Sequence, residues 1–429
     1  MTVLMFGWEF PPHISGGLGT ACLGLATALM EQDIKLFFVV PRAQGDEPIT
    51  LIDASQIPVG GQDPFVRSSR EEHLSGSRLI AIPASITPYS QHEPFHSLEA
   101  WNWRYLSEED RRGNNGRRVH YAFRGGYGPA LLEEIQRYAV VAAEIARQYS
   151  FDVIHAHDWL TFLAGMEAKT VSGRPLIVHV HATEVDRAGK DHLDERIFAI
   201  EQRGMLAADV VIAVSHWTKN IITQKYGIAA NKVHVVHNGV APAADADFPF
   251  IPRIGDYVVT FLGRVTHQKG PQYFVDAARK VLDYFPDTHF IMAGSGDLLT
   301  SIIERAARSQ ISSRLHFTGF LEGEQIHQVW SVTDVYVMPS VSEPFGITPL
   351  EAVQAGVPVI VSNQSGVAEV MDHVIKVDFW DTDALANAII SVFRHKGLSA
   401  ALKLNGQHEI KTLTWKRTAK RINQLYHEI

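Results

Sequence analysis

The sequence predicts an α/β protein with two domains, each built on a parallel sheet. The chain has 429 residues, which exceeds the size of one ordinary hydrophobic core. Short apolar strand-like runs alternate with helix-like runs, first in the N-terminal half and again after residue 256. The two series are separated by residues 241–256, whose prolines and small residues are typical of a linker.

The N-terminal series indicates a first domain over residues 1–240. The expected helices are residues 18–30 and about 194–207, and the expected strands are residues 3–6, 35–40, 153–155, 176–180, 210–213 and 233–236. The alternation fails between residues 45 and 128, and a long irregular insertion of this kind is usually functional. Its aromatic side chains either stack on sugar rings or cover the core of their own domain: Tyr89, Phe95, Trp101, Trp103, Tyr105, Tyr121 and Tyr127.

The C-terminal series indicates a second domain over residues 257–401. The expected helices are residues 271–284 and a helix from about 348, and the expected strands are residues 257–262, 289–293, 316–317, 335–338 and 357–361. Residues 402–429 form an amphipathic helical tail, which we expect to pack back on the N-terminal domain.

Composition excludes several classes of protein. A net charge of -8 argues against non-specific binding of nucleic acid. The single cysteine, Cys22, excludes a disulfide framework and favours a packing role in a reducing compartment, so we expect a cytoplasmic protein. We expect neither a membrane span nor a signal peptide, because the apolar run at residues 3–6 is short and Glu9 follows it.

Two loops predict binding of an anion. Open α/β sheets bind ligands at the carboxyl ends of their strands, so we expect the site in the cleft between the domains. The stretch WEFPPHISGGLGT follows the first strand, and Gly16 and Gly17 there offer backbone amides at a helix start. In the second domain, GRVTHQKG places Arg264 and Lys269 in a loop before a helix, which suits a diphosphate; the alternative is a solvated basic loop.

Two glutamates bracket the stretch EPFGITPLE. Glu343 lies in a strand-to-helix loop and Glu351 in the first helical turn, and carboxylates are well suited to accept hydrogen bonds from vicinal sugar hydroxyls. Glu351 also has a structural interpretation, because Thr348 as N-cap and Glu351 at the third helical position form a capping box. Glu343 has no such structural role.

Histidines follow two further strands, in HAHDW at residues 155–159 and HVHATE at 179–184. We interpret His179 as structural and His181 as functional, through hydrogen bonds to hydroxyls or acid–base chemistry. The H-x-H spacing suggests a metal, but no third ligand stands near it in the sequence. The two D-x-D triplets, at 245–247 and 381–383, are interpreted as non-catalytic, the second as a helix cap. HNG at 237–239 and GSGD at 294–297 are expected to be backbone turns.

Seven motifs together resemble a known family. SGGLGT, HAHDW, HATE, HNG, GRVTHQKG, GSGD and EPFGITPLE occur in the order and spacing of retaining GT-B glycosyltransferases. The chain resembles glycosyltransferase family 4 over essentially its whole length outside residues 45–128. WEFPPHISGGLGT with HAHDW makes it most similar to glycogen synthase-like members. The resemblance implies a GT-B fold, with two Rossmann-like domains facing a central cleft.

The resemblance also implies a role for each matching residue. Arg264 and Lys269 would bind the donor diphosphate, helped by the amides of Gly16 and Gly17, while Glu343 would bind hydroxyls of the donor sugar. The remaining donor-side contacts would be Glu351 on the nucleotide ribose, Phe320 beside the base, Gly346 in the donor loop, and His181 near the reacting carbon. Asp158 and Glu9 would line the acceptor side.

The implied activity is transfer of glucose, with retention, from ADP- or UDP-glucose to the non-reducing end of an α-1,4-glucan such as glycogen, without a metal or cofactor. Two departures leave the donor and acceptor open: Ile14 stands where starch-type synthases carry lysine, and Ala182 where they often carry asparagine. The alternatives are another family 4 hexosyltransferase, of the sucrose, trehalose or mannosyl transfer type, a phosphorylase, or a non-catalytic glucan-binding protein. A phosphorylase is disfavoured, because the chain is short for one and shows no motif for its pyridoxal lysine.

Overall fold

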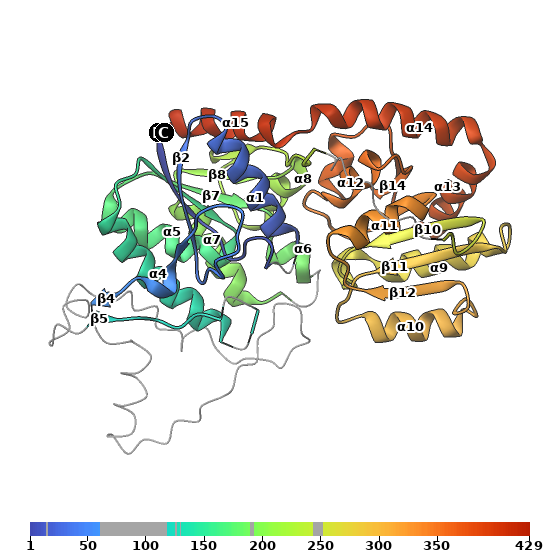
Figure 1. The fold of residues 1–429 in the computed structure, drawn as a ribbon, viewed down its shortest axis with the longest axis horizontal. Helices are drawn as coiled ribbons and strands as arrows, with labels where there is room; N and C mark the ends of the chain where they lie inside the picture. Colours follow the sequence, from blue (N-terminus) through green and yellow to red (C-terminus); the bar gives the residue numbers. More distant parts are fainter. Residues whose placement is uncertain (14–15, 61–117, 125–126, 129, 189–192, 243–251) are drawn as a thin grey trace, which may run out of the picture. The chain divides into compact units, whose positions relative to one another are not determined.

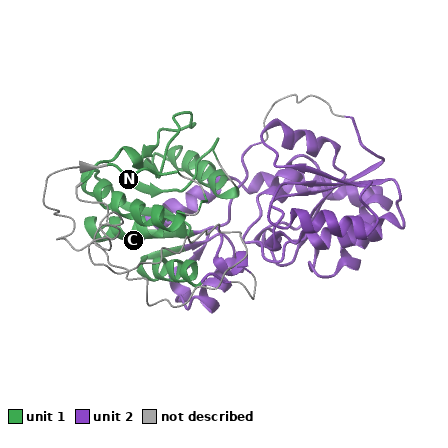
Figure 2. Cartoon of the chain, turned by 90° about the horizontal axis from the view of Figure 1, so that it is seen from below, with its two compact units in different colours: residues 1–179, 195–211, 429 green, residues 180–194, 212–428 purple. Residues whose placement is uncertain are grey.

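The computed structural model describes residues 1–13, 16–60, 118–124, 127–128, 130–188, 193–242 and 252–429. The chain divides into two compact units (Figure 2). Unit 1 comprises residues 1–179 and 195–211 with Ile429, and unit 2 comprises residues 180–194 and 212–428. Residues 180–194 and 212–240 thus fall in unit 2, whereas the sequence predicts a first domain over residues 1–240.

The first sheet has seven strands in the order β3-β2-β1-β6-β7-β8-β9 (Figure 1). Strand β1 is third in this order, between β2 and β6, and runs parallel to both; β2 is also parallel to β3, and β6 to β7. This order is that of a doubly wound nucleotide-binding fold. The strands are β1 Thr2–Phe6, β2 Lys35–Val40, β3 Ile52–Asp53, β6 Val153–His157, β7 Leu176–Val180, β8 Val210–Ala213 and β9 Val233–Val235.

Helices connect these strands, and their buried faces are apolar. In α5, Gly165 lies so close to the sheet that a Cβ atom there would come within 2.8 Å of the Leu176 side chain and 3.0 Å of Ala156. Glycine at this position therefore sets how closely the helix packs on β6 and β7. The helices of this half are α1 Gly17–Met30, α4 Leu131–Gln148, α5 Trp159–Ser172, α6 Glu184–Ala188, α7 Glu195–Ala207 and α8 His216–Lys225.

The second sheet has six strands in the order β12-β11-β10-β13-β14-β15, and every neighbouring pair is parallel. Its strands are β10 Tyr257–Leu262, β11 Thr288–Ala293, β12 Leu315–Gly319, β13 Val335–Met338, β14 Val359–Ser362 and β15 Ile375–Val377. Its helices are α9 Pro271–Leu282, α10 Leu299–Arg308, α11 Glu324–Val332, α12 Thr348–Gln354, α13 Thr382–Arg394, α14 Lys396–Glu409 and α15 Trp415–His427. The carboxyl ends of these parallel strands meet at one edge, where ligands bind in such sheets.

The predicted fold class is confirmed, while several individual elements differ from their prediction. The tail is two helices and not one: α14 ends at Glu409, and the side chain of Thr414 caps α15 by accepting the N–H of Arg417. The described parts of the insertion contain β3 and a small antiparallel pair, β4 Val59–Gly60 with β5 Arg118–Val119. The sequence predicts no element at α4, α5, α6, α8, α10, α11 or β15.

Some predictions from the sequence concern single residues of the fold. Cys22 is fully buried in α1, as its packing role requires, and Tyr121 is buried in its own domain. The other insertion aromatics up to Tyr105, the D-x-D triplet at 245–247 and most of the linker lie outside the described residues. No helix in the described part of the chain combines the length and apolarity that a membrane crossing demands.

Candidate functional site

The loop after β10 carries the two predicted cations of unit 2. Arg264 and Lys269 lie between the strand and α9, with Lys269 at the end of a short 3₁₀ turn, His267–Lys269. Gly270 follows with φ of +64°, and a Cβ atom there would come 2.2 Å from the carbonyl oxygen of Pro339. Only glycine permits this approach, which brings the β10 loop against the end of β13.

Lys269 and Glu343 form an ion pair. The ammonium donates to Glu343 Oε2 at 2.5 Å, and the hydroxyl of Ser340 donates to the same oxygen at 3.1 Å. The Glu343 side chain is 7% exposed and the Lys269 side chain 21%. The structure thus brings together two residues that the resemblance assigns to different parts of one ligand, and the charge of each neutralises that of the other.

Arg264 lies at the opposite end of the same loop. Its guanidinium donates to the side-chain oxygen of Gln268 at 3.4 Å. The nearby Asp297 carboxyl has its pKa raised by partial burial, an effect that hydrogen bonds and the charge of Arg264 oppose. The GSGD turn packs directly on this loop, since a Cβ atom at Gly294 would meet the carbonyl oxygen of Gly263 at 2.0 Å.

Glu351 is half-buried in α12, and burial raises the pKa of its carboxyl. The predicted capping box is wrong: the N-cap is Ile347, Thr348 is already the first helical residue, and no side-chain cap forms among the described residues. Thr348 instead hydrogen-bonds Tyr336 on β13. Glu351 therefore loses its structural interpretation.

Glu343 and Glu351 lie near the same tyrosine. Burial raises the pKa of the Tyr336 hydroxyl well above its usual value, and the charges of Glu343 and Glu351 raise it further. Two acids from one loop and the following helix therefore lie close together at the end of β13. Gly346, with φ of +97°, provides the turn between them.

His181 directly follows β7 and belongs to unit 2. Burial lowers the pKa of its imidazole to about 3. The ring is therefore neutral near pH 7 and suited to hydrogen bonding, which favours that interpretation over acid–base chemistry. Phe320, at the end of β12, is 53% exposed.

Asp186 is a buried residue that sequence reasoning missed. Its carboxylate accepts hydrogen bonds from the N–H and hydroxyl of Thr183, at 2.9 and 2.7 Å, and from the hydroxyl of Ser342. Ser342 precedes Glu343 and also accepts from the indole N–H of Trp217 at 3.0 Å. A direct bridge thus joins the loop of His181 to the loop of Glu343, over a separation of 156 residues that no local pattern could have indicated.

The start of α8 holds the other side of the Glu343 loop. The hydroxyl of Ser215 donates to the carbonyl oxygen of Pro344 at 2.5 Å. The Glu369 carboxylate accepts from the N–H groups of His216 and Trp217 and from the ring of His237. Burial raises the pKa of Glu369, but these hydrogen bonds outweigh it and the net shift is downward.

The HNG motif is irregular backbone after β9 and not the turn that the sequence predicts, and packing explains its glycine. A Cβ atom at Gly239 would come 2.2 Å from the backbone nitrogen of Trp415, the first residue of α15. The hydroxyl of Thr418 in α15 donates to the carbonyl oxygen of His237. The C-terminal helix thus packs on the segment just before the predicted linker.

In unit 1, α1 begins at Gly17 with Gly16 as its N-cap. The Glu9 carboxylate accepts the N–H of Gly19 at 3.3 Å, so an acid already lies at the predicted anion site. Asp158, at the end of β6, has φ of +58°, a strained backbone for a residue other than glycine. Asp158 and Glu9 both lie near Cys22, since burial and then these two charges raise the pKa of its thiol. Ile14 lies outside the described residues.

Three buried histidines of unit 1 lie together. Ring nitrogens of His155, His157 and His179 all lie within 4.8 Å of one another, so the expectation that the histidines lack a third partner is wrong. His181 is not part of this group. The ring of His155 stacks on the rings of His157 and His179, at interplanar angles of 19° and 16°, while His157 and His179 are tilted by 33°. The centroids lie 4.4–5.4 Å apart, and all three side chains are buried.

Two family models match the chain side by side. The model described as glycosyltransferase family 4 matches residues 90–244, and the model described as glycosyl transferases group 1 matches residues 246–409. The chain is 26% identical to an uncharacterised glycosyltransferase of Methanocaldococcus jannaschii, over 99% of this chain and 98% of that protein. It is 28% identical to a glycogen synthase of Mycobacterium tuberculosis, over 86% of this chain and 80% of that enzyme.

Solved structures share the fold over the whole chain. Sucrose-phosphate synthase from Thermosynechococcus elongatus matches with a TM-score of 0.70 at 19% identity, covering 100% of this chain and 98% of that one. The Anabaena protein HepE, in complex with UDP-glucose, matches with a TM-score of 0.63 at 16% identity, covering 100% of both chains. At these sequence identities, the similarity to both structures shows a shared fold and nothing further.

Proposed function

The chain belongs to glycosyltransferase family 4 and has the GT-B fold; from this premise we propose that it transfers glucose from ADP- or UDP-glucose to the non-reducing end of an α-1,4-glucan, with retention. The observation that carries the proposal is the Lys269–Glu343 pair, a cation for a diphosphate beside an acid for sugar hydroxyls. The similarity to a glycogen synthase supports the acceptor, and the UDP-glucose complex of a structural neighbour supports the kind of donor. The buried single cysteine is compatible with the cytoplasm, which remains the proposed location.

In the proposed reaction, the bond between the anomeric carbon and the diphosphate breaks while an acceptor hydroxyl attacks from the same face. The proton of that hydroxyl passes to the departing diphosphate oxygen. Arg264 and Lys269, with the amides of Gly16 and Gly17, stabilise the charge on the leaving group in the role that a divalent metal takes elsewhere. The neutral His181 hydrogen-bonds the sugar.

Two carboxylates orient the donor in this scheme. Glu343 exchanges its bond to Lys269 for hydroxyls of the transferred sugar, and Lys269 is released toward the diphosphate. Glu351 accepts from the ribose hydroxyls, and its raised pKa falls when such donors stabilise the charged form. Both changes need the complete nucleotide sugar.

A second candidate function is transfer to a small, phosphorylated sugar. The observation that favours it is a pocket of unit 1 with two arginines on its lining. Similar proteins include an α-maltose-1-phosphate synthase of Mycolicibacterium smegmatis, 28% identical over 65% of this chain and 79% of that enzyme. This candidate leaves the donor chemistry unchanged.

Nucleotide release tests the proposal. The full chain is incubated with UDP-, ADP- and GDP-glucose and with GDP-mannose, each with and without glycogen. We expect one glucose donor to give glycogen-stimulated release and a longer glucan product. If nucleotide is released but glycogen does not increase the rate with any donor, the glucan acceptor is overturned. If no nucleotide is released with any donor or acceptor, the non-catalytic glucan-binding alternative is favoured.

A further inference from the structure

Three histidines lie on one face of the first sheet. His155 and His157 are alternate residues of β6, so their side chains point to the same side of the sheet. In the register of β6 with the parallel strand β7, His157 pairs with His179. Directly paired residues share a face, and the pairing of the two strands therefore brings together three imidazoles that the sequence separates.

The three rings are close enough to share one metal ion. One ring nitrogen of each histidine lies within 4.8 Å of those of the other two, and all three residues are 0% exposed. Three nitrogens around one tetrahedral zinc ion lie about 3.3 Å apart, because each Zn–N bond is about 2.0–2.1 Å long. The rings must also turn, since His155 stacks on its two neighbours and each lone pair lies in its ring plane. The last side-chain torsion of histidine is soft, so rotation about it lets the nitrogens converge.

The chemistry of this group suits a transition metal. Imidazole nitrogens bind zinc, copper and nickel, whereas magnesium and calcium prefer oxygen ligands. Neutral imidazoles bring no charge, and a buried dication needs some compensation. Asp158 directly follows His157, is 6% exposed, and donates its backbone N–H to the carbonyl oxygen of His179 at 2.9 Å. A buried acid therefore lies at the ends of the same two strands, where its negative charge offsets part of the charge of a metal.

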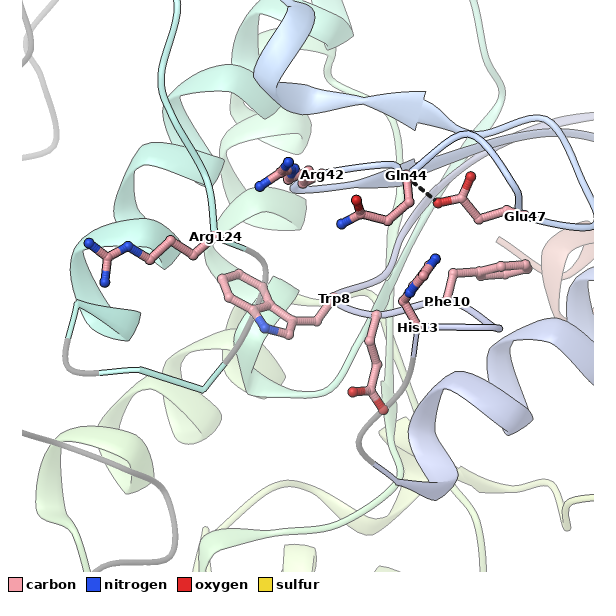
Figure 3. A pocket seen from close by; sticks show the side chains of 8 residues that line it. Trp8, Phe10, His13, Arg42, Gln44, Glu47 and Arg124 are labelled. Carbon is pink, nitrogen blue, oxygen red and sulfur yellow. Dashed lines mark hydrogen bonds between the residues drawn. The ribbon is translucent and has the colours of Figure 1, made fainter. Parts of the chain in front are cut away.

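The histidine group is separate from the other candidate sites. The pocket of unit 1 lies where β1 and β2 end (Figure 3), and its lining includes Trp8, Arg42 and Arg124 but none of the three histidines. Arg264 and Lys269, the cations for the donor diphosphate, belong to unit 2. A metal held by the histidines is thus an element of unit 1 and takes no part in stabilising the leaving group.

We propose that His155, His157 and His179 together bind one divalent transition-metal ion, for which zinc is the best fit. The ion joins β6 to β7 at their carboxyl ends, and water fills its fourth position. It fixes the ends of the two strands that lead into Asp158 and His181, which the resemblance assigns to the acceptor side and to the sugar. The binding is independent of the proposed function, whose reaction uses no metal.

The zinc content of the untagged full chain tests the site. The chain is produced in medium that contains zinc, so that the buried site fills as the protein folds. It is then dialysed against a weak chelator, and its metal is measured by mass spectrometry. We expect about one zinc ion per chain. Removal of the metal with a strong chelator should lower the midpoint of thermal unfolding, because the ion binds the folded chain.

Two variants and a matched control assign the metal to the histidine group. His157→Gln and His179→Gln each remove one ligand. The control is His316→Gln, which removes one histidine of a stacked pair in unit 2 whose ring nitrogens lie 2.8 Å apart. Competition with a coloured chelator measures the affinity for zinc. Each ligand variant should weaken it by more than the roughly 10- to 100-fold that loss of an outer partner costs, and the control should leave it unchanged.

A spectroscopic measurement keeps the proposal testable if both ligand variants fail to fold, which circular dichroism checks. X-ray absorption by the zinc of the wild type should show three imidazole nitrogens at about 2.0–2.1 Å. A coordination sphere of oxygens or with a single imidazole would overturn the site.

Three further outcomes contradict the site. One is a wild-type chain that holds no metal after growth with zinc, and another is zinc bound with unchanged affinity by both ligand variants. The third is loss of zinc from His316→Gln alone, which would place the ion on the pair in unit 2. Transfer by a chain that binds no zinc would refute this site and leave the proposed function standing. Zinc binding without transfer to any acceptor would refute the proposed function alone.

Discussion

Lys269 and Glu343 illustrate what single residues contribute and how far the sequence predicts them. Both were predicted as site residues from their loops, but their pairing joins positions 74 apart and follows only from the fold. The structure also corrects the local prediction at Thr348, whose hydroxyl bonds Tyr336 and does not cap α12. A capping pattern is a short-range signal, and it cannot indicate a hydrogen bond to a tyrosine on the preceding strand.

Removing the ammonium of Lys269 should impair turnover more than folding. We expect Lys269→Ala to lower kcat about 10²- to 10³-fold, as loss of one preorganised donor to a developing anion does in other enzymes. Lys280→Ala is the matched control, because Lys280 pairs with Asp383 in the same unit and away from this loop. Steady-state kinetics of nucleotide release measure both, and near-normal turnover of Lys269→Ala would contradict its role.

His181 should make stability depend on pH in a predictable direction. The folded chain holds the imidazole at a pKa of about 3, while the unfolded chain has the ordinary value of 6.5. Below pH 6.5 the His181 imidazole is protonated in the unfolded chain but stays neutral in the folded chain. The free energy of unfolding therefore falls as pH decreases toward 3.

Urea unfolding of the wild type and of His181→Asn between pH 7 and 4 measures this effect. The wild type should lose stability relative to the variant, by at most about 1.4 kcal/mol per pH unit for one proton. Subtracting the free energy of unfolding of the variant from that of the wild type at each pH removes the contribution of the other histidines. Parallel curves for the two proteins would contradict the low pKa.

At the scale of elements, the loop of Glu343 is held from several sides. Asp186 in α6 accepts a hydrogen bond from Ser342, Ser215 at the start of α8 donates to Pro344, and Gly270 allows the β10 loop to approach the end of β13. The strands of both sheets were predicted closely, because buried parallel strands are short apolar runs between loop residues. Several helices, among them α4 and α5, were not predicted, and the break between α14 and α15 was missed because the apolar pattern of the tail continues through it.

The bridge from Asp186 to Ser342 should position Glu343 for transfer. We expect Asp186→Asn and Ser342→Ala each to lower kcat more than they raise the KM for the donor. The double variant should lose less than the two single losses combined, with a coupling of about 0.5–3 kcal/mol.

Kinetics of the four proteins form the double-mutant cycle for this bridge. Ser301→Ala, which removes an exposed hydroxyl in α10, is the control in the same unit. Additive losses from Asp186→Asn and Ser342→Ala would mean that each residue acts alone and that the bridge positions nothing.

At the scale of the whole chain, the two sheets repeat one strand order. In each, the first strand of the chain is third in the sheet, and the loop that follows it carries predicted ligand-binding residues: Gly16 and Gly17 after β1, and Arg264 and Lys269 after β10. Alternation of strands and helices predicted this architecture because each parallel crossover needs a helix. The assignment of residues 180–194 to unit 2 was not predictable, since it depends on contacts between segments distant in sequence.

The ion pair between Lys269 and Glu343 has a consequence for the timing of a reaction cycle. In the proposed reaction, a complete nucleotide sugar would offer a diphosphate to Lys269 and hydroxyls to Glu343, so both charges would be compensated when the pair opens. After transfer, the nucleotide diphosphate alone would leave Glu343 without a partner, and re-formation of the ion pair would compete with the product for Lys269. Under this proposal the ion pair favours binding of the complete donor and release of the spent nucleotide.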